Sequence, residues 1–235
     1  TSQKTLEFEK NKKKIEKISL TFDKMIFKDV TFSYDSNDKI IKNLNVEINK
    51  NNLIGVCGRS GSGKTTFLNL ILGLLKPTNG EIAINGNLKL NENLNSWQEL
   101  LSYMPQDLFI IKDNLRNNIT LSENFDNNTD EKIFNALREV ELFDRVNELP
   151  KGLNTEISEM GLNFSGGQRQ RIVLARSIYH NKDIFVLDEV TSALDIKTTE
   201  SIIKLLLNLK KNKTIIISTH NKNILDYCDK VIDLD

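Results

Sequence analysis

The chain has 235 residues, of which 39% are hydrophobic, so it is long enough for one α/β domain with a sizeable core. Its 32 basic and 32 acidic residues balance, so no overall positive charge favours a nucleic-acid-binding protein. No uninterrupted apolar run approaches the roughly 20 residues that span a bilayer, and the polar, lysine-rich start lacks the apolar core of a signal peptide.

The first residues of the chain carry many charges. Residues 1–24 are rich in lysine, which predicts a solvated linker or tail. Apolar and polar side chains then alternate over 26–34, which predicts a half-buried strand that ends in the turn cluster 35–38. A second strand is predicted over 40–48, and residues 50–52 are expected to turn the chain into a third.

A short apolar run over 53–57 predicts a buried strand, and it is followed by a loop of glycine and serine and then by a helical pattern. Gly58, Gly63, Lys64 and Thr65 fit the pattern G-x-x-x-x-G-K-[ST], a P-loop. Such glycines let backbone N–H groups approach phosphate oxygens, and the helix that follows presents its positive end to them. Lys64 is expected to contact the β- and γ-phosphates and the Thr65 hydroxyl to bind Mg²⁺. The alternative, a plain turn before a helix, is disfavoured by the flanking strand and helix.

The two cysteines, Cys57 and Cys228, lie far apart in the sequence and form no C-x-x-C motif. This favours two reduced thiols in a reducing compartment. Because Cys57 belongs to the predicted core strand, we expect it to be a small buried apolar group.

Beyond the P-loop, a short strand is predicted over 81–85, a short apolar run follows over 100–104, and a single helix is predicted over 129–149. The elements predicted in the last third of the chain are a helix over 166–180, a strand over 184–187, a helix over about 196–210, a strand over 214–218, a short helix from 221 and a strand over 231–234. Strands alternate with helices here, which predicts a mostly parallel, helix-covered sheet. Antiparallel strands are expected at the start and a helical insert in the middle.

Two carboxylates, Asp188 and Glu189, directly follow the apolar strand predicted over 184–187. In open α/β sheets, ligands bind at the carboxyl ends of the strands. Asp188 is expected to position Mg²⁺, and Glu189 to polarise an attacking water as general base. A strand ending in an acidic turn is the alternative, and the P-loop upstream favours the functional interpretation.

The segment from Ser165 to Gln168 has two interpretations. Ser165-x-x-Gln168 fits a capping box, which a plain helix start would explain. However, Gly166 and Gly167 are poor helix formers, and they make sense if backbone N–H groups must lie close to an anion. Together with Phe164, this segment resembles the LSGGQ signature of ATP-binding cassette (ABC) ATPases, with Phe in place of the usual Leu.

The resemblance extends over nearly the whole chain from about Lys24, because further motifs follow in the family's order. It implies that Tyr34 stacks on adenine and that Gln106 is the Q-loop glutamine, associated with Mg²⁺ and with a transmembrane partner. Residues 192–195 resemble the D-loop, which includes Asp195, and His220 resembles the switch histidine that contacts the γ-phosphate. The alternatives are a core aromatic at Tyr34, a turn residue at Gln106 and a structural histidine at 220.

The resemblance implies ATP and Mg²⁺ as ligands of the site. The residues implied to contact the nucleotide are Tyr34, Gly58, Arg59, Ser60, Gly61, Ser62, Gly63, Lys64, Thr65, Thr66, Gln106, Ser165, Gly166, Gly167, Gln168 and Asp195. Thr65, Gln106 and Asp188 are implied to hold Mg²⁺, and Lys64, Glu189 and His220 are implied to be catalytic. The second histidine, His180, matches no motif and is expected at the surface.

Within the family, residues 105–109, 114–119, 149–152 and 166–171 resemble the exporter branch. The resemblance implies the ABC ATPase form of the P-loop NTPase fold. It comprises a mostly parallel core sheet, an antiparallel β subdomain and a helical subdomain at about 107–165. Residues 1–24 are then expected to be the linker from a transmembrane domain, and residues 25–235 the ATPase domain. Two departures are Val190, where Ala is usual, and Ser218-Thr219 before His220, where exporters commonly have Ala.

The implied function is the ATP-hydrolysing motor of an exporter at the cytoplasmic face of a cell membrane, with a bacterial inner membrane favoured. Its implied partners are a second copy, bound around two ATP molecules, and a transmembrane domain on the same polypeptide; no nucleic acid is expected. Two alternatives are a soluble ABC ATPase acting on nucleic acid or ribosomes, and a small-molecule P-loop kinase. A peptide, a lipid-linked saccharide and a lipid all remain open as the transported substrate.

Overall fold

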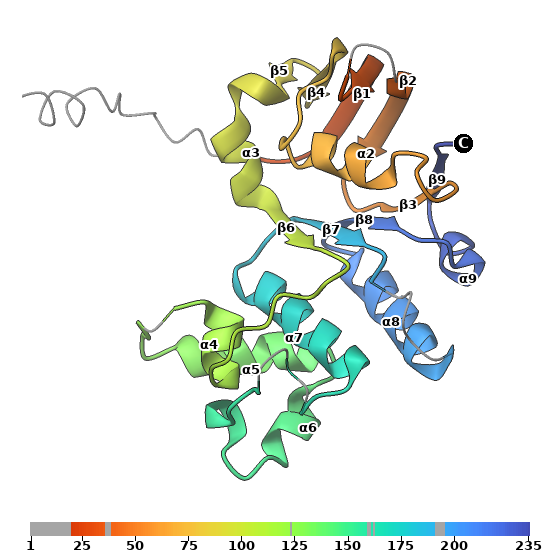
Figure 1. Cartoon of the computed structure of the whole chain (residues 1–235). Helices are drawn as coiled ribbons and strands as arrows, with labels where there is room; N and C mark the ends of the chain where they lie inside the picture. Colours follow the sequence, from red (N-terminus) through yellow and green to blue (C-terminus); the bar gives the residue numbers. More distant parts are fainter. Residues whose placement is uncertain (1–19, 36–38, 123, 159–160, 162, 191–195) are drawn as a thin grey trace, which may run out of the picture.

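The computed structural model describes residues 20–35, 39–122, 124–158, 161, 163–190 and 196–235. Most of the predicted linker, residues 1–19, lies outside the described residues. The described part forms an antiparallel sheet, a parallel sheet and a group of helices, which follow one another from top to bottom in Figure 1.

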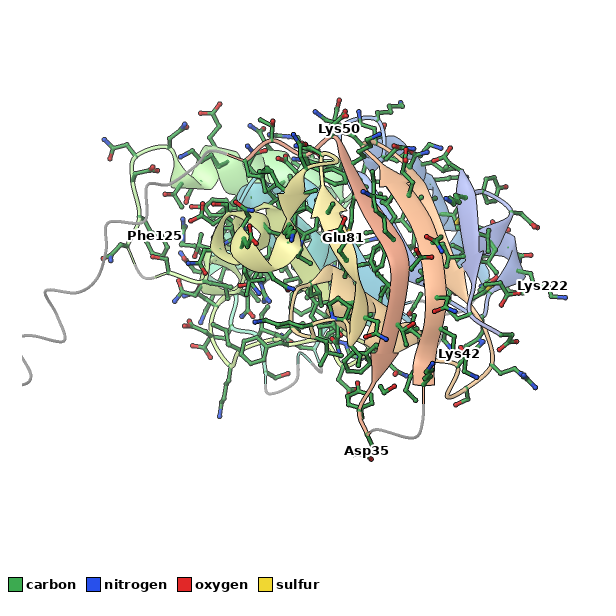
Figure 2. The ribbon with its side chains drawn as sticks, turned by 90° about the horizontal axis from the view of Figure 1, so that it is seen from above. Asp35, Lys42, Lys50, Glu81, Phe125 and Lys222 are labelled. Atoms are coloured by element: carbon green, nitrogen blue, oxygen red, sulfur yellow. The ribbon has the colours of Figure 1, made fainter. Side chains whose placement is uncertain are left out.

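The antiparallel sheet contains strands β1 (Lys24–Ser33), β2 (Lys39–Asn49), β4 (Asn79–Ile84) and β5 (Leu88–Lys89), in the order β2-β1-β4-β5. Seen from above, β1 and β2 run side by side, with Lys50 at one end of the pair and Asp35 at the other (Figure 2). The pairing confirms the antiparallel strands expected at the start of the chain. The predicted alternation of β1 is interrupted: Met25 and Phe27 are buried, the next two residues are exposed, and Val30 to Phe32 are all buried. The interruption lies where the register with β2 shifts, between Phe27 and Val30.

The second sheet holds strands β6 (Leu101–Met104), β7 (Ile184–Asp188), β8 (Thr214–Ser218), β3 (Leu53–Cys57) and β9 (Lys230–Asp233), in the order β6-β7-β8-β3-β9. Every neighbouring pair is parallel. All residues of β7 and β8 are buried, which explains their continuous apolar sequence. Because the strands are parallel, the loops that follow β3, β7 and β8 meet at one edge of the sheet.

Helix α2 (Lys64–Ile71) packs between the two sheets, because its apolar residues share one core cluster with β1, β2 and β3. The unpredicted helix α3 (Leu94–Leu100), preceded by a short 3₁₀ turn (Leu90–Glu92), extends this cluster. Its Trp97 is 1% exposed and its indole Nε1 donates a hydrogen bond to the carbonyl of Ile71 at 2.7 Å. The helix therefore closes one side of the core over α2.

A second core cluster joins the other face of the parallel sheet to helices. These are α4 (Leu115–Thr120), α5 (Thr129–Glu139), α6 (Phe143–Asn147), α7 (Gly166–Tyr179), α8 (Ile196–Leu209) and α9 (Lys222–Leu225), with a 3₁₀ turn at Gly152–Asn154. The predicted helices over 166–180 and 196–210 are confirmed within one residue. Helix α4 was not predicted.

The prediction of one helix over 129–149 was wrong, because α5 and α6 are separated by a turn. Glu141 has a left-handed φ of 54°. The guanidinium of Arg171, from α7, donates hydrogen bonds to the carbonyls of Val140 and Glu141. These carbonyls therefore find their partner on another helix instead of in a next turn of α5. The break also allows Val140 and Leu142, on either side of it, to be buried together.

Gly80 and Gly86 offer a matched test of the β1–β4 pairing. Both have a left-handed φ, 79° and 88°, but a Cβ on Gly80 would lie 2.4 Å from the carbonyl oxygens of Lys28 and Asp29, where β1 is bulged. A Cβ on Gly86 would meet nothing within 4 Å. We expect Gly86→Ala to cost about 1–2 kcal/mol of unfolding free energy, from backbone strain alone. Gly80→Ala should cost clearly more, because the strand must also shift.

Urea denaturation followed by circular dichroism measures both variants. Equal costs for the two substitutions would contradict the close packing of Gly80 against β1.

Candidate functional site

The loop between β3 and α2 is shaped by glycine. Gly58, Gly61 and Gly63 have φ values of 139°, 81° and 99°, a region that other residues rarely adopt. Gly63 is the N-cap of α2 and no side chain caps that helix, so its first N–H groups remain available to a ligand. The buried hydroxyl Oγ of Ser62 also has no hydrogen-bond partner among the described residues. The loop can therefore receive an anion with several oxygens.

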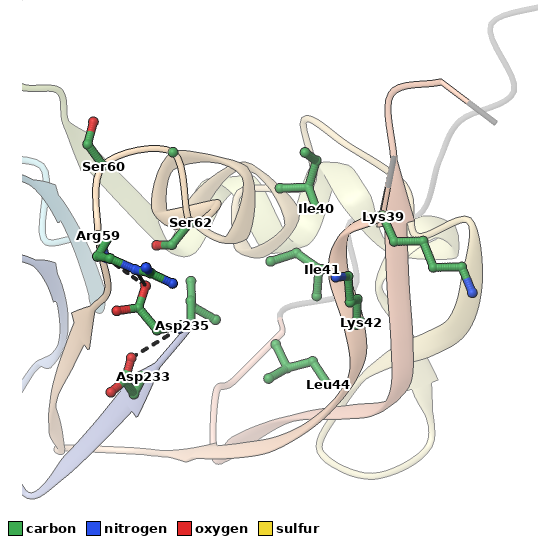
Figure 3. Close-up of a pocket in the computed structure, with 12 residues that line it drawn as sticks. Lys39, Ile40, Ile41, Lys42, Leu44, Arg59, Ser60, Ser62, Asp233 and Asp235 are labelled. Atoms are coloured by element: carbon green, nitrogen blue, oxygen red, sulfur yellow. Dashed lines mark hydrogen bonds and ion pairs between the residues drawn. The ribbon is translucent and has the colours of Figure 1, made fainter. Parts of the chain in front are cut away.

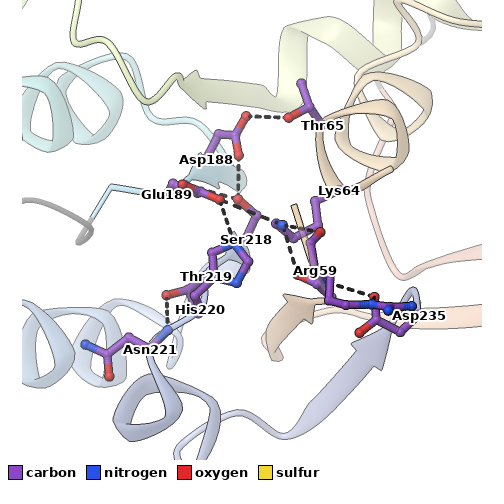
Figure 4. Close-up of polar contacts among 11 residues, drawn as sticks. Arg59, Lys64, Thr65, Asp188, Glu189, Ser218, Thr219, His220, Asn221 and Asp235 are labelled. Carbon is purple, nitrogen blue, oxygen red and sulfur yellow. Dashed lines mark hydrogen bonds and ion pairs between the residues drawn. The ribbon is translucent and has the colours of Figure 1, made fainter. Parts of the chain in front are cut away.

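Lys64, the first residue of α2, lies beneath this loop and is 7% exposed. Its ammonium Nζ donates hydrogen bonds to the carbonyls of Gly58 at 3.0 Å and Arg59 at 3.1 Å. The same Nζ lies 3.9 Å from Oε1 of Glu189 (Figure 4). The structure thus brings the P-loop lysine and the predicted general base into one cluster, although they are 125 positions apart (189 − 64).

Asp188, the last residue of β7, is 7% exposed and uses its two carboxylate oxygens differently. Oδ2 accepts a hydrogen bond from the Thr65 hydroxyl at 3.3 Å, and Oδ1 accepts one from the Ser218 hydroxyl at 2.5 Å (Figure 4). Oxygen atoms of a hydroxyl and a carboxylate are the protein ligands that Mg²⁺ takes beside phosphate. The predicted metal-binding pair is therefore brought together.

Glu189 follows directly and has a left-handed φ of 47°. Its backbone N–H donates to both the carbonyl and the hydroxyl of Ser218, at 3.1 and 3.0 Å. Its Oε1 lies 3.2 Å from Nε2 of His220, which follows β8. The carboxylate is thus partly exposed between a histidine and a lysine, where a water molecule can reach it (Figure 4).

Two further residues at this edge were missed from the sequence, Ser218 and Tyr103. Tyr103 of β6 pairs in register with Val186 and so lies on the face of the sheet that also carries Asp188. Burial raises the pKa of the Tyr103 hydroxyl, and so do the charge of Asp188 and a side-chain hydrogen bond to it. No sequence signal singles out Tyr103, because β6 and β7 become neighbours only in the folded sheet.

Tyr34 lies close to the start of α2, and its expected stacking on adenine stays a prediction. Its side chain is 62% exposed, its hydroxyl is 3.3 Å from Oγ1 of Thr66, and its ring packs edge-on against Phe32. Gln106 is exposed and follows Met104, the last residue of β6, by two positions. Because Met104 pairs with Leu187, Gln106 lies at the same sheet edge as Asp188. Asp195 lies outside the described residues. His180 is exposed, as expected.

The predicted signature segment caps α7. The Ser165 hydroxyl accepts a hydrogen bond from the N–H of Gln168 at 3.3 Å, and the Gln168 side chain accepts one from the N–H of Ser165 at 3.0 Å. The capping box is therefore confirmed. A Cβ on Gly167 would lie 2.6 Å from Cγ2 of Thr198, so this glycine is also required by packing against α8. Ser165 is exposed, and its hydroxyl bonds within its own segment instead of to the P-loop cluster.

A cavity of about 600 Å³ opens beside the outer side of the P-loop, between β2 and the end of β9 (Figure 3). Arg59 and Asp235 form one wall of it, because the backbone N–H of Arg59 donates to Oδ1 of Asp235 at 2.8 Å and its guanidinium lies 3.4 Å from the same oxygen. The backbone hydrogen bond from Arg59 is the main reason why the pKa of Asp235 is lowered. Ser60, Gly61 and Ser62 line this cavity with the first residues of β2.

Cys57 is only partly buried, so the expectation that it is a small buried group was wrong. Burial raises the pKa of Cys57, and it raises the pKa of Cys228 from 9.0 to about 11. Because the thiolate is the reactive form, Cys228 should react slowly with a disulfide reagent at pH 8 in the folded protein. Stability should also fall as pH rises from 9 towards 11, because only the unfolded chain releases this proton there.

Thiol titration with Ellman's reagent, with and without urea, measures this. If each thiol reacted at the same rate in the folded protein as in the unfolded protein, the result would contradict the predicted slow reaction of Cys228.

The described residues fit a nucleotide with a magnesium ion. The left-handed glycines, the orphaned Ser62 hydroxyl and the uncapped helix start suit phosphate oxygens. Thr65 and Asp188 supply oxygen ligands that suit Mg²⁺, which usually completes its shell with water and phosphate. Within the described ranges, no cluster of three or more histidine, cysteine or acidic residues suggests a different, all-protein metal site.

Comparison with known proteins agrees with this site. The sequence model of a family described as "ABC transporter" matches residues 41–192. A "Probable ABC transporter ATP-binding/permease protein" of Haemophilus influenzae is 36% identical over 206 residues, covering 88% of this chain and 37% of the relative. The "ATP-dependent lipid A-core flippase" of Pasteurella multocida is 34% identical over 210 residues, covering 89% and 36%. The chain thus spans just over a third of the length of these relatives.

Among solved structures, one described as a bacterial Atm1-family ABC exporter with ATP bound superposes with a TM-score of 0.80 at 28% identity. The match covers 92% of this chain and 38% of that one. No helix in the part of the chain that the structure describes is long and apolar enough to cross a membrane.

Proposed function

The chain belongs to the ABC transporter family and has the fold of its ATPase domain, and we propose that it is the motor domain of a membrane exporter. The observation that carries the proposal is the cluster of Lys64, Asp188, Glu189 and His220 at the carboxyl edge of the parallel sheet. The similarity of this chain to ATP-binding/permease proteins supports the coupling of this site to transport.

ATP is the proposed substrate. The backbone N–H groups of the loop 58–63 and the start of α2 bind its phosphates, and Lys64 exchanges its loop carbonyls for the β- and γ-phosphate oxygens. Tyr34 stacks on the adenine, from its exposed position beside Thr66. Ser62 has a buried hydroxyl ready for a phosphate oxygen.

Hydrolysis is assigned to Glu189 and His220. Glu189 orients an attacking water and accepts its proton, while His220, 3.2 Å from the carboxylate, holds Glu189 in place and contacts the γ-phosphate. Thr65, Asp188 and Gln106 would hold Mg²⁺, which neutralises developing charge on the phosphate oxygens when bound. Lys64 is close enough to Glu189 for one ligand to contact both side chains.

The signature segment Ser165–Gln168 is proposed to act on the nucleotide of a second copy. It is exposed and bonds within itself, so its helix tip is available to an anion presented by another subunit. Two copies would thereby enclose two ATP molecules, with Asp195 beside them. ATP and ADP differ in the γ-phosphate, so hydrolysis removes the charge that the opposing tip binds and favours opening of the pair.

The remaining assignments follow from the relatives, of which the matched part of this chain covers 37% and 36%. Residues 1–24 are proposed to link a transmembrane domain on the same polypeptide to the ATPase domain at 25–235, whose helical subdomain spans about 107–165. We propose that the domain lies at the cytoplasmic face of a cell membrane. We propose no nucleic-acid partner, and the transported substrate is left open between a peptide, a lipid-linked saccharide and a lipid.

Phosphate release tests the proposal. The purified domain should hydrolyse ATP in the presence of Mg²⁺, with a rate per subunit that rises with protein concentration as dimers form. A rate that DNA, RNA or ribosomes stimulate strongly would instead favour the soluble class of ABC ATPase. Transfer of phosphate to a small-molecule acceptor would favour a kinase. Transport by vesicles that contain the full-length protein, measured against a panel of cargoes, then identifies the substrate.

A further inference from the structure

We propose that Ser218 is a positioning residue that fixes both acidic residues of the hydrolysis site through one hydroxyl group. This inference rests on the proposed function, because it assigns Ser218 a role in the reaction of Asp188 and Glu189. Ser218 ends β8, pairs in register with Asp188 of β7 and is 0% exposed. A buried polar side chain at this place requires partners, and both of its partners belong to the neighbouring strand end.

The first partner is the carboxylate of Asp188. The Ser218 hydroxyl donates its proton to Oδ1 at 2.5 Å, which leaves Oδ2 directed at the Thr65 hydroxyl, 3.3 Å away. A quarter-turn of the carboxylate about its last bond would break both hydrogen bonds. Ser218 therefore fixes the plane of the carboxylate, so that one oxygen faces the proposed metal-binding side of the site.

The second partner is the backbone of Glu189. Its N–H donates to the Ser218 hydroxyl oxygen at 3.0 Å as well as to the Ser218 carbonyl at 3.1 Å. Glu189 has a left-handed φ of 47°, a conformation that residues other than glycine adopt only when their surroundings impose it. In this conformation the Glu189 carboxylate lies 3.2 Å from His220 and 3.9 Å from Lys64.

The hydroxyl thus acts as a donor to one residue and an acceptor to the next, and an alanine could do neither. The adjacent Thr219 does not duplicate this role, because its hydroxyl accepts a hydrogen bond from the N–H of Asn221. Loss of the Ser218 hydroxyl should therefore disturb the orientation of Asp188 and the backbone of Glu189 together, without changing how the P-loop binds phosphate.

The test compares Ser218→Ala and Ser218→Thr with the unsubstituted protein. Ser177→Ala is the matched control, since Ser177 is also a buried serine and its hydroxyl bonds to Ser102 and to the carbonyl of Val173. We expect Ser218→Ala to lower kcat by about 10–100-fold, with KM for ATP nearly unchanged, and to raise the Mg²⁺ concentration needed for half-maximal rate. Ser218→Thr should restore most of the rate because it keeps the hydroxyl, and Ser177→Ala should leave kcat and the Mg²⁺ requirement unchanged.

A second measurement does not depend on catalysis. Hydrogen exchange at the Glu189 amide, followed by NMR, should be roughly tenfold or more faster in Ser218→Ala than in the unsubstituted protein and in Ser177→Ala. Unchanged exchange and unchanged kcat in Ser218→Ala would overturn the inference, and so would a folded Ser218→Thr that is as slow as the alanine variant. An unsubstituted protein that never hydrolyses ATP would overturn the proposed function instead, and the exchange rates alone would then decide on Ser218.

Discussion

Glu189→Gln is expected to slow ATP hydrolysis by about 10²–10⁴-fold while ATP binding is retained. The substitution keeps the size of the side chain and removes the charge that accepts a proton from water. The amide can still occupy the position beside His220, where Oε1 of Glu189 lies 3.2 Å from the imidazole nitrogen. Because nucleotide contacts by Lys64 and the loop 58–63 are untouched, ATP should accumulate uncleaved between two copies.

Size-exclusion chromatography with and without ATP, combined with phosphate release, measures this outcome. The variant should elute as a dimer with ATP and as a monomer with ADP. Glu139→Gln, at an exposed position on α5, is the matched control and should behave like the unsubstituted protein. Normal turnover by Glu189→Gln would remove this residue from the role of general base.

Lys64→Met is expected to weaken ATP binding by about 2–5 kcal/mol, or roughly 30- to 5,000-fold in Kd. The apolar stem of Lys64 is buried and methionine reproduces it, so the change removes mainly the ammonium group. That group lies against the carbonyls of Gly58 and Arg59, at the centre of the loop that is proposed to receive the β- and γ-phosphates.

Titration with a fluorescent ATP analogue measures the affinity. Lys89→Met is the control, because Lys89 is an exposed lysine on β5, in the other sheet. If ATP binds equally well to Lys64→Met, with its fold intact by circular dichroism, the loop is not the phosphate site.

Most of the fold could be predicted because most elements carry a local signal, although the short helices α3 and α4 were missed. The buried strands β7 and β8 are continuous apolar runs, and α7 begins at a capping box that the sequence shows directly. The candidate-site residues Lys64, Thr65, Asp188 and Glu189 could be singled out for the same reason, since each adjoins such an element. Their meeting at one sheet edge follows from the parallel order of the strands.

What the sequence did not show depends on contacts between distant segments. The break between α5 and α6 is stabilised by Arg171, which lies on another helix and reaches the carbonyl of Val140. Tyr103 and Ser218 become site residues only because β6 and β8 flank β7 in the sheet. Strand order is not encoded in any one segment, so neither residue stands out from its own surroundings in the sequence.

In the proposed mechanism, one ATP is held by the P-loop of one copy and by the signature helix tip of the other. Mixing two inactive variants distinguishes this shared site from a site formed within one copy. Lys64→Met disables the P-loop. Gly166→Asp places a negative charge at the tip of α7, where an acidic residue suits the helix start but repels phosphate. Each variant alone should be inactive.

In a mixed pair, the intact P-loop of the Gly166→Asp copy faces the intact tip of the Lys64→Met copy, which rebuilds one complete site. We therefore predict that an equal mixture recovers about a quarter of the unsubstituted rate, the value for random pairing into symmetric dimers. A mixture that is no more active than the two variants measured separately would contradict a nucleotide site shared between two copies.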